Sequence, residues 1–315
     1  MNILYFEPLS RGWDRMKKAL FQPFDLNKWF VVGFTAFLAG LLDGPGGGGG
    51  GGNKKWDGFH DLNNIADFPS EAWDWLMNHP GWFSLILFGL VFFISLAILF
   101  IWLSSRGKFM FLDNVVHDKA QITKPWYQYK KQGDSLFLWR LVYGFICLAA
   151  FIAMLIFFFS LILSMFHGDI SGAQKVSSII GMVLLFLTFI IITGYISLFL
   201  NDFVVPIMYK YNLTAIKAWN RFLPLFTQHF LYFVLYGIII FLLIILVVIC
   251  VILFGLLTCC IGFLLLIIPY IGSVVTLPIS YTYRAFSLEF LEQFGPEFTF
   301  FPKAEETSTD SPAQQ

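Results

Sequence analysis

The sequence predicts an all-α integral membrane protein, from its composition and from the length of its apolar runs. Of the 315 residues, 58% are hydrophobic and 13% are charged, whereas a typical soluble protein has about 25% charged residues. A soluble fold of this size could not bury so much apolar surface, because much of any folded chain stays exposed. The composition therefore excludes a soluble enzyme, a disordered chain and a basic nucleic-acid-binding protein.

The lengths of the apolar runs predict six transmembrane helices. Between His229 and Arg284 there are 54 consecutive residues without Asp, Glu, Lys or Arg. A helix of that length would measure about 80 Å, against a hydrocarbon core of about 30 Å. This stretch must therefore cross twice, with a turn near Gly255–Gly262. The six predicted spans are residues 29–42, 82–103, 136–166, 176–200, 230–256 and 262–283.

The first apolar run is the shortest, and its 14 residues could form a short span, a re-entrant segment or an interfacial helix. The charges favour a span, because six spans with an inner N-terminus place 17 of the 20 basic residues on the inner side. Both termini are then cytoplasmic. The expected organisation is an N-terminal interfacial helix (1–28), a membrane domain (29–301) with an exterior glycine-rich loop (43–81), and a disordered tail (302–315).

An internal repeat is predicted from a shift of the sequence by 93 residues. The shift aligns Lys124–Trp126 with Lys217–Trp219, and Trp13 heads a weaker third copy. Each copy starts with a short amphipathic segment, as Trp13, Met16 and Leu20 illustrate by sharing one helical face. We therefore predict three parallel repeats, each an interfacial helix followed by a two-span hairpin. The alternative is that interfacial helices resemble one another without a repeat. The predicted interfacial anchors are Trp13, Trp126 and Trp219.

Polar residues concentrate at the predicted cytoplasmic ends of the spans, and mid-depth positions are nearly free of charge. We name this set the cytoplasmic polar rim: Arg106, Lys108, Asp113, Asn114, Arg140, Asn201, Asp202, Arg284 and Glu289. The rim could bind an anionic headgroup or a protein partner. It could equally consist of ordinary charged side chains at the ends of spans. The leading hypothesis is a non-enzymatic membrane module that binds membrane lipids or an unidentified protein through this side.

Two other functions stay open. The last span contains helix-breaking residues and could line a transport path for a lipid-like or neutral solute near Thr276 and Pro278. An enzyme would require four polar residues to converge, namely Asp113, Asp202, Arg106 and His117. No cofactor is expected. No metal site is expected either, since the spacing of His60 and His79 with Asp57 and Asp61 matches no zinc pattern.

The segments RMKKALFQPFDLNKWFVVGFTAFLAG, SSRGKFMFLDNVV and NDFVVPIMY, together with the glycine run, resemble an uncharacterised bacterial membrane-protein family. That family is similar to the membrane domain attached to some bacterial glycerophosphoryl diester phosphodiesterases. The resemblance covers Gly12 to Phe294 and implies a six-span fold in the bacterial plasma membrane. Phosphodiesterase activity is not expected, because a catalytic barrel needs about 250 residues and the longest segment outside the spans is residues 43–81.

Overall fold

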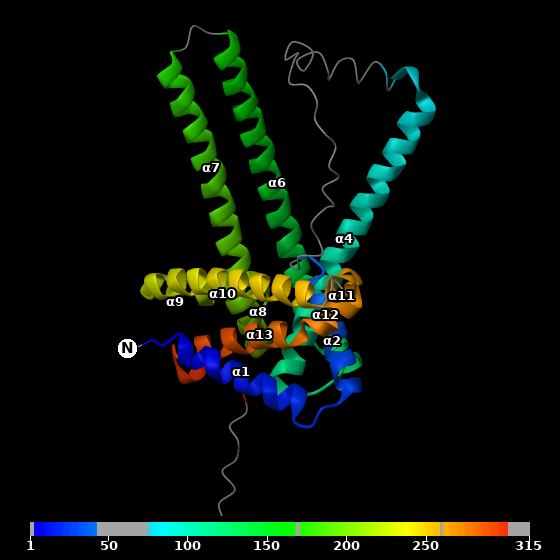
Figure 1. Ribbon diagram of the computed structural model, residues 1–315, viewed down its shortest axis with the longest axis vertical. Coiled ribbons are helices and arrows are strands. Elements are labelled where there is room, and N and C mark those ends of the chain that lie inside the picture. The colour runs from blue at the N-terminus through cyan, green and yellow to red at the C-terminus, as the bar shows by residue number, and fades with distance from the viewer. Residues whose placement is uncertain (1–2, 43–74, 76, 168–170, 259–260, 302–315) are drawn as a thin grey trace, which may run out of the picture.

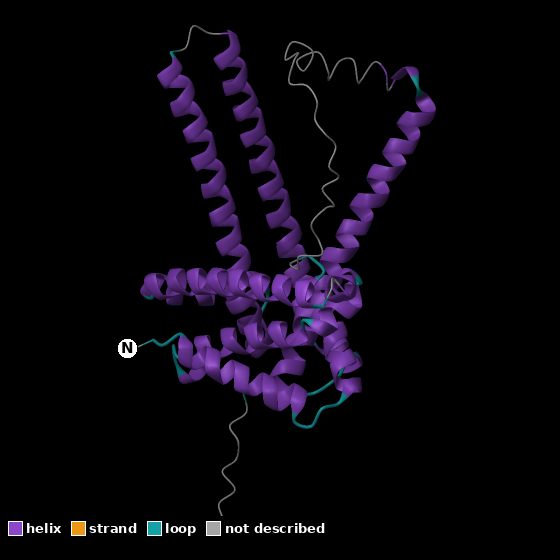
Figure 2. Ribbon diagram, in the orientation of Figure 1, coloured by secondary structure: helices purple, strands orange, loops and turns teal. Residues whose placement is uncertain are grey.

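The computed structural model describes residues 3–42, 75, 77–167, 171–258 and 261–301. Within these ranges the regular structure is helical and contains no strand (Figure 2). Most of the predicted exterior loop (43–74 and 76) and the predicted tail (302–315) lie outside the described residues. The all-α prediction is confirmed for the part of the chain that the structure describes.

The helices follow one another in this order: α1 (Phe6–Phe21), α2 (Leu26–Gly40), α4 (Pro80–His117), α5 (Thr123–Gln128), α6 (Lys130–His167), α7 (Gly172–Phe199), the π-helix η1 (Leu200–Val204), α8 (Val205–Tyr211), α9 (Ala215–Gln228), α10 (Phe230–Leu257), α11 (Ile261–Ile267), α12 (Pro269–Val275), α13 (Leu277–Glu292) and the 3₁₀ helix η2 (Pro296–Phe298).

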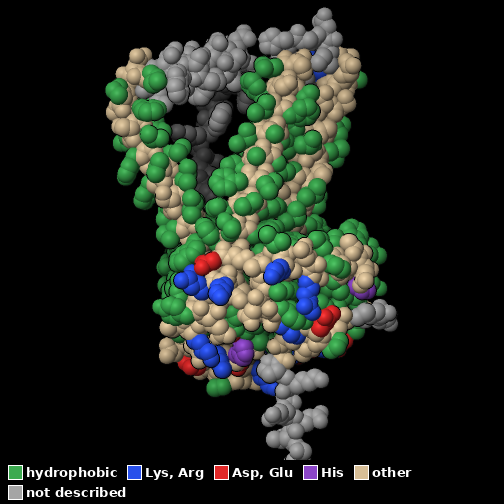
Figure 3. Space-filling view, turned by 180° about the vertical axis from the view of Figure 1, so that it is seen from behind, with side chains coloured by type: hydrophobic (Ala, Val, Ile, Leu, Met, Phe, Trp, Pro, Cys, Tyr) green, Lys and Arg blue, Asp and Glu red, His purple; other side chains and the backbone are tan. Residues whose placement is uncertain are grey.

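Four helical segments are long and apolar enough to cross a membrane: Pro80–His117, Lys130–Ser164, Gly172–Tyr211 and Phe230–Leu257. This finding supports a membrane protein. In Figure 1, α6, α7 and the first half of α4 project from one side of a compact body, whereas α10 lies across their base. Space-filling representation shows the projecting helices covered with hydrophobic side chains (Figure 3). Residues 29–42 and 262–283, the other two predicted spans, do not form long helices.

The helix α4 has two halves with opposite surroundings. In the first half, residues 80–103, apolar side chains are exposed; Phe88, for example, is 74% exposed. In the second half, every residue from Ser104 to Val116 is buried. The buried part includes charged residues, among them Lys108, which is 1% exposed. The predicted span 82–103 therefore corresponds to the exposed half, and the helix continues into the body beyond it.

The short helix α2 packs along the buried half of α4. Ser104 donates a hydrogen bond to the carbonyl oxygen of Ala39 over 3.0 Å, and near the other end Lys28 forms a 2.9 Å ion pair with Asp118. Gly107 permits this contact, since a Cβ there would lie 2.6 Å from the carbonyl carbon of Leu38. The first predicted hairpin is thus not formed by residues 29–42 beside 82–103. The partner of α2 is the polar half of α4, where buried polar groups require protein neighbours.

The last apolar stretch turns and breaks as the sequence predicts. The helix α10 ends at Leu257 and α11 starts at Ile261, which places the turn within the predicted segment Gly255–Gly262. Residues 262–283 are then divided among α11, α12 and α13, with breaks at Ile268 and Thr276. Proline after each break removes one backbone donor and favours a helix start. Leu277 beside the second break is fully buried, which does not favour an open polar cavity at this point.

The core of the body is rich in aromatic side chains. Phe203 of η1 stacks on Phe222 of α9 and contacts Phe233 and Tyr236 of α10, with ring centroids 5.0–5.4 Å apart. Phe290 of α13 adds a contact to Tyr236 at 4.6 Å. Pairs of this kind stabilise a fold beyond the area they bury. They join four elements that are distant in the sequence.

The amphipathic helix α1 packs on α13. Gly12 lies against the α13 backbone, and a Cβ at that position would be 3.0 Å from the amide nitrogen of Phe286. Met16 and Leu20, which the sequence assigns to a membrane-facing side, are 1% and 0% exposed in the protein core. That assignment is wrong for these two residues. An apolar helical face can be covered by protein as well as by lipid, and here α13 covers it.

Candidate functional site

The polar rim residues lie on the buried half of α4, the start of α6, η1 and α13. The structure does not gather them into a single site. It distributes them over several polar clusters that connect helices distant in the sequence. The partners of each cluster decide what it could do.

The first cluster forms around the π-helix η1. Lys108 donates a hydrogen bond to the side-chain oxygen of Asn201, and Arg284 donates to the backbone carbonyl of Asn201 over 2.7 Å. Asp202 accepts a hydrogen bond from the Tyr236 hydroxyl at 3.0 Å. The wider turn of a π-helix displaces backbone carbonyls from the usual α-helical pattern, which makes the Asn201 carbonyl accessible to Arg284. This cluster links α4, η1, α10 and α13.

The second cluster surrounds Asp113, which is 7% exposed. Its carboxylate accepts hydrogen bonds from the hydroxyls of Tyr209 at 2.7 Å and Tyr129 at 3.2 Å. Nδ1 of His117 lies 3.2 Å from the same carboxylate. Burial, with the nearby Asp113 charge, raises the pKa of Tyr129 to about 12, so this hydroxyl remains protonated and can donate.

Arg106 belongs to a third cluster, at the start of the buried half of α4, next to the exposed half. It forms a 2.9 Å ion pair with Asp134 of α6. Its guanidinium carbon lies 4.5 Å from the ring centroid of Trp102 and 5.0 Å from that of Trp126. Such cation–π contacts hold Arg side chains against aromatic faces. The cluster therefore fixes α5 against α4 and α6.

The other rim residues also connect helices. Arg140 donates a hydrogen bond to Ser104 over 3.1 Å. Asn114 donates to Thr35 and to the carbonyl oxygen of Gln121, over 3.3 and 3.0 Å. Glu289, whose side chain is 1% exposed, binds Arg15 at 2.5 Å and Arg11 at 3.5 Å.

Of the four residues that an enzyme would need to bring together, Asp113 and His117 meet. Arg106 binds Asp134, and Asp202 binds Tyr236, in other clusters. Among the described residues, no group of three His, Cys, Asp or Glu residues could hold a metal ion. Asp57, His60 and Asp61 lie outside the described residues.

Sequence reasoning missed the tyrosines and Asp134 as partners of the rim. Tyr129 and Tyr209 are 16 and 96 residues from Asp113, and Asp134 is 28 residues from Arg106. No local spacing could have indicated these pairs. A hint was available only in the high aromatic content, since buried Tyr hydroxyls require partners.

The three predicted anchors differ in their surroundings. Trp13 on α1 is 47% exposed. Trp126 on α5 is half-buried and packs at right angles on Trp102, with ring centroids 5.7 Å apart. Trp219 on α9 is half-buried and stacks on Trp139 of α6 at 5.6 Å. The helices α5 and α9 therefore meet α4 and α6 at the level where the exposed apolar surface of those helices begins.

A belt of exposed basic residues lies on and beside α5 and α9. We name it the basic belt, and it consists of Lys119, Lys124, Lys130, Lys131, Lys217 and Arg221. Figure 3 shows Lys and Arg side chains on the body, below the hydrophobic helices. Arg221 is 3.1 Å from Glu297, and its guanidinium lies 3.8 Å from the ring centroid of Tyr211.

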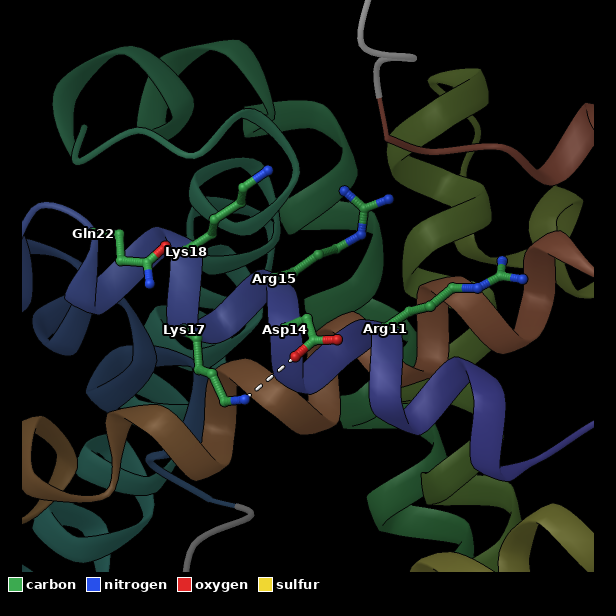
Figure 4. Close-up of a pocket in the computed structure, with 6 residues that line it drawn as sticks. All are labelled: Arg11, Asp14, Arg15, Lys17, Lys18 and Gln22. Atoms are coloured by element: carbon green, nitrogen blue, oxygen red, sulfur yellow. Dashed lines mark hydrogen bonds and ion pairs between the residues drawn. The ribbon is translucent and has the colours of Figure 1, made fainter.

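A second basic surface is a shallow groove of about 600 Å³ along α1. We name it the α1 groove, and it is lined by Arg11, Asp14, Arg15, Lys17, Lys18 and Gln22 (Figure 4). Lys17 is 3.4 Å from Asp14. The pKa of Arg11 is raised, chiefly by its hydrogen bond to Glu7. The groove presents four cationic side chains and one carboxylate.

The sequence pattern of a family of unknown function, DUF7544, matches residues 5–291. This chain belongs to that family. The matched region runs from the segment before α1 almost to the end of α13 and contains every residue of the polar rim. No curated protein and no solved structure matches the chain, and these comparisons show no link to the membrane domains of glycerophosphoryl diester phosphodiesterases.

Proposed function

We propose that the protein is a non-enzymatic module of the plasma membrane that binds anionic lipid headgroups with its basic belt, on the cytoplasmic side. The observation that carries the proposal is the position of the belt. It lies on α5 and α9, whose tryptophans contact α4 and α6 where their exposed apolar surface begins. Anionic lipids of the cytoplasmic leaflet attract Lys and Arg side chains near the surface.

The proposal includes six membrane crossings with cytoplasmic termini. Four segments have sufficient length and composition for a crossing. Of these, α10 lies across the base of α6 and α7 in Figure 1, so its crossing would require it to turn relative to them. The other two crossings would use α2, about 22 Å long by its 15 residues, and the broken segment α11–α12–α13. Short or interrupted helices cross a membrane where protein neighbours satisfy their backbone groups. The belt is on the inner side of this topology, in agreement with the positive-inside rule.

The polar rim has a structural part in this proposal. Its residues are largely buried and bind partners on other helices, so the rim would hold the helices of the body together. The segments SSRGKFMFLDNVV and NDFVVPIMY support the further proposal that the chain is similar to the membrane domain attached to some glycerophosphoryl diester phosphodiesterases.

Lipid retention tests the proposal. The protein is reconstituted in a mixture of phosphatidylglycerol and phosphatidylcholine, and the retained lipids are counted by native mass spectrometry. We expect enrichment of phosphatidylglycerol in the wild type and loss of the enrichment in K124Q/K217Q. The matched control is K17Q/K18Q, which removes two lysines from α1. Equal loss in both variants, or no loss in K124Q/K217Q, would contradict a headgroup site at the belt.

Tryptophan fluorescence gives a second readout that does not depend on lipid charge. Brominated lipids quench tryptophans that lie near the acyl chains. We expect W126F and W219F each to reduce the quenchable fraction of the total emission. Unchanged quenching in both variants would show that α5 and α9 are not at the membrane interface.

A further inference from the structure

The α1 groove lies beside the point where the described chain ends. The Arg15 guanidinium carbon lies 3.7 Å from the ring centroid of Phe301, the last described residue. Phe301 itself is 6% exposed and belongs to the core. The last described residue is therefore in contact with a residue that lines the groove.

The segment that leads to Phe301 is fixed to the body. Nζ of Lys210 donates hydrogen bonds to the carbonyl oxygens of Glu297 and Thr299, at 2.5 and 2.6 Å. The Tyr211 hydroxyl donates to the Glu297 carbonyl at 2.8 Å, and Phe298 is 3% exposed. The starting point of residues 302–315 is consequently set by contacts with α8 and with the core.

The charges of residues 302–315 complement those of the groove. This segment contains Glu305, Glu306 and Asp310 and a single basic residue, Lys303. Glu305 is four residues beyond Phe301, so it can reach at most about 14 Å from it. Lys18 is three residues from Arg15 on the same helix face, roughly 5 Å away. The acidic residues can therefore reach the groove without any change in the body.

We propose that the acidic segment 302–315 of this chain is the occupant of the α1 groove, with Glu305 and Glu306 paired to Lys17 and Lys18. Covalent attachment beside the groove gives the segment an effective concentration in the millimolar range. Exposed ion pairs are individually weak and are screened by salt. The segment should therefore occupy the groove at low ionic strength and leave it at high ionic strength. This proposal does not depend on lipid binding by the basic belt.

Zero-length carbodiimide cross-linking of the full chain, reconstituted in phosphatidylcholine, tests the proposal. The reagent joins Lys amines to carboxylates in direct contact, and mass spectrometry identifies the joined peptides. We expect Lys17 or Lys18 joined to Glu305 or Glu306, with at least a tenfold lower yield in 0.5 M NaCl. The 2.9 Å pair Lys28–Asp118 provides an internal control for the fold and for the reagent.

Three variants determine the outcome. E305Q/E306Q and K17E/K18E should each lose the product while retaining Lys28–Asp118, and the charge-swapped chain K17E/K18E/E305K/E306K should regain a product between the same positions. Absence of the product beside an intact control, or joining of Glu305 and Glu306 to the basic belt, would overturn the proposal. A mixture of ¹⁵N-labelled and unlabelled chains distinguishes docking within one chain from docking between two copies. Cross-linked products that contain one labelled and one unlabelled peptide would identify a second copy as the occupant.

Discussion

The two halves of α4 belong to one continuous helix but reverse the usual relation between polarity and burial. In residues 80–103 the apolar side chains are outside, with Leu85 62% and Phe88 74% exposed. In residues 104–116 the charged side chains are inside, with Lys108 1% and Asp113 7% exposed. The first half has the surface of a helix solvated by lipid, and the second has the partners that buried charges need.

This difference shows that burial in the chain depends on partners and not on side-chain polarity. A buried phenylalanine and an exposed one on the same helix should therefore respond differently to truncation. Substitution of a glycine or loss of a polar contact should likewise have different effects in the buried part and in the exposed part.

Truncation of phenylalanine should distinguish the halves most clearly. Phe109 is 1% exposed, so F109A is expected to lower the free energy of unfolding by about 3–5 kcal/mol through lost contacts and a cavity. F88A, in the exposed half, should cost less than about 1 kcal/mol, because lipid is as apolar as the side chain it replaces. Unfolding curves of both variants in bicelles check the pair. Equal losses would show that residues 80–103 are buried in an assembly.

Glycine substitutions should reveal the close approach of α2. G107A would place a Cβ 2.6 Å from backbone and side-chain atoms of Leu38, and we expect a loss of about 1–3 kcal/mol from overpacking. At Gly89 no atom lies within 4 Å of an added Cβ. G89A should therefore be neutral, or more stable by up to about 1 kcal/mol because of its higher helix propensity. The same unfolding assay applies, and a neutral G107A would mean that α2 does not pack on the second half of α4.

Removal of a single hydroxyl should have a smaller effect. The Tyr209 hydroxyl donates to Asp113 at 2.7 Å, and hydrogen bonds to charged groups contribute about 1.5–3 kcal/mol. Y209F is expected to lower stability by that order. Y127F is the matched control, since Tyr127 is 70% exposed and should tolerate the change. Equal stability of Y209F and wild type would indicate that another group replaces the donor.

The smallest effect should be seen only in alkali. The pKa of Tyr129 is raised from 10.0 to about 12 by burial and by Asp113. A raised pKa means that the folded state favours the protonated phenol, so this contribution is fully present below pH 10 and is lost as the pH rises towards 12. The stability difference between wild type and Y129F should therefore shrink from pH 9 to pH 12. A constant difference would place the Tyr129 hydroxyl in water.

Much of the fold could be predicted from the sequence where the signal is local. The fifth span was predicted as residues 230–256 and the helix is Phe230–Leu257, because a long uncharged stretch bounded by His229 and a turn has few alternatives. The breaks in the last apolar stretch were also predicted, since Pro269 and Pro278 act on their own neighbours. Both features follow from residues within a few positions of one another.

The rest could not be predicted, because it depends on contacts across the chain. Lys108 and Asn201 are 93 residues apart, and Tyr209 and Asp113 are 96 apart. The sequence marked Lys108, Asn201 and Asp113 as rim residues but gave no sign that they are buried. Likewise, the spacing of Met16 and Leu20 predicted an amphipathic helix correctly but not which surface covers its apolar face. Whether α2 and the α11–α13 segment cross the bilayer stays a prediction.

The continuity of α4 has a mechanical consequence. Its 38 residues form one helix about 57 Å long. One end of this rod carries exposed apolar side chains, and the other end packs against α2. A tilt of about 10° in the lipid-facing part would displace the far end of that part by about 6 Å. A thinner or thicker bilayer changes the preferred tilt of a spanning helix. In a membrane, such a rod would be expected to pass that change as torque to the Lys28–Asp118 and Asn114–Thr35 contacts.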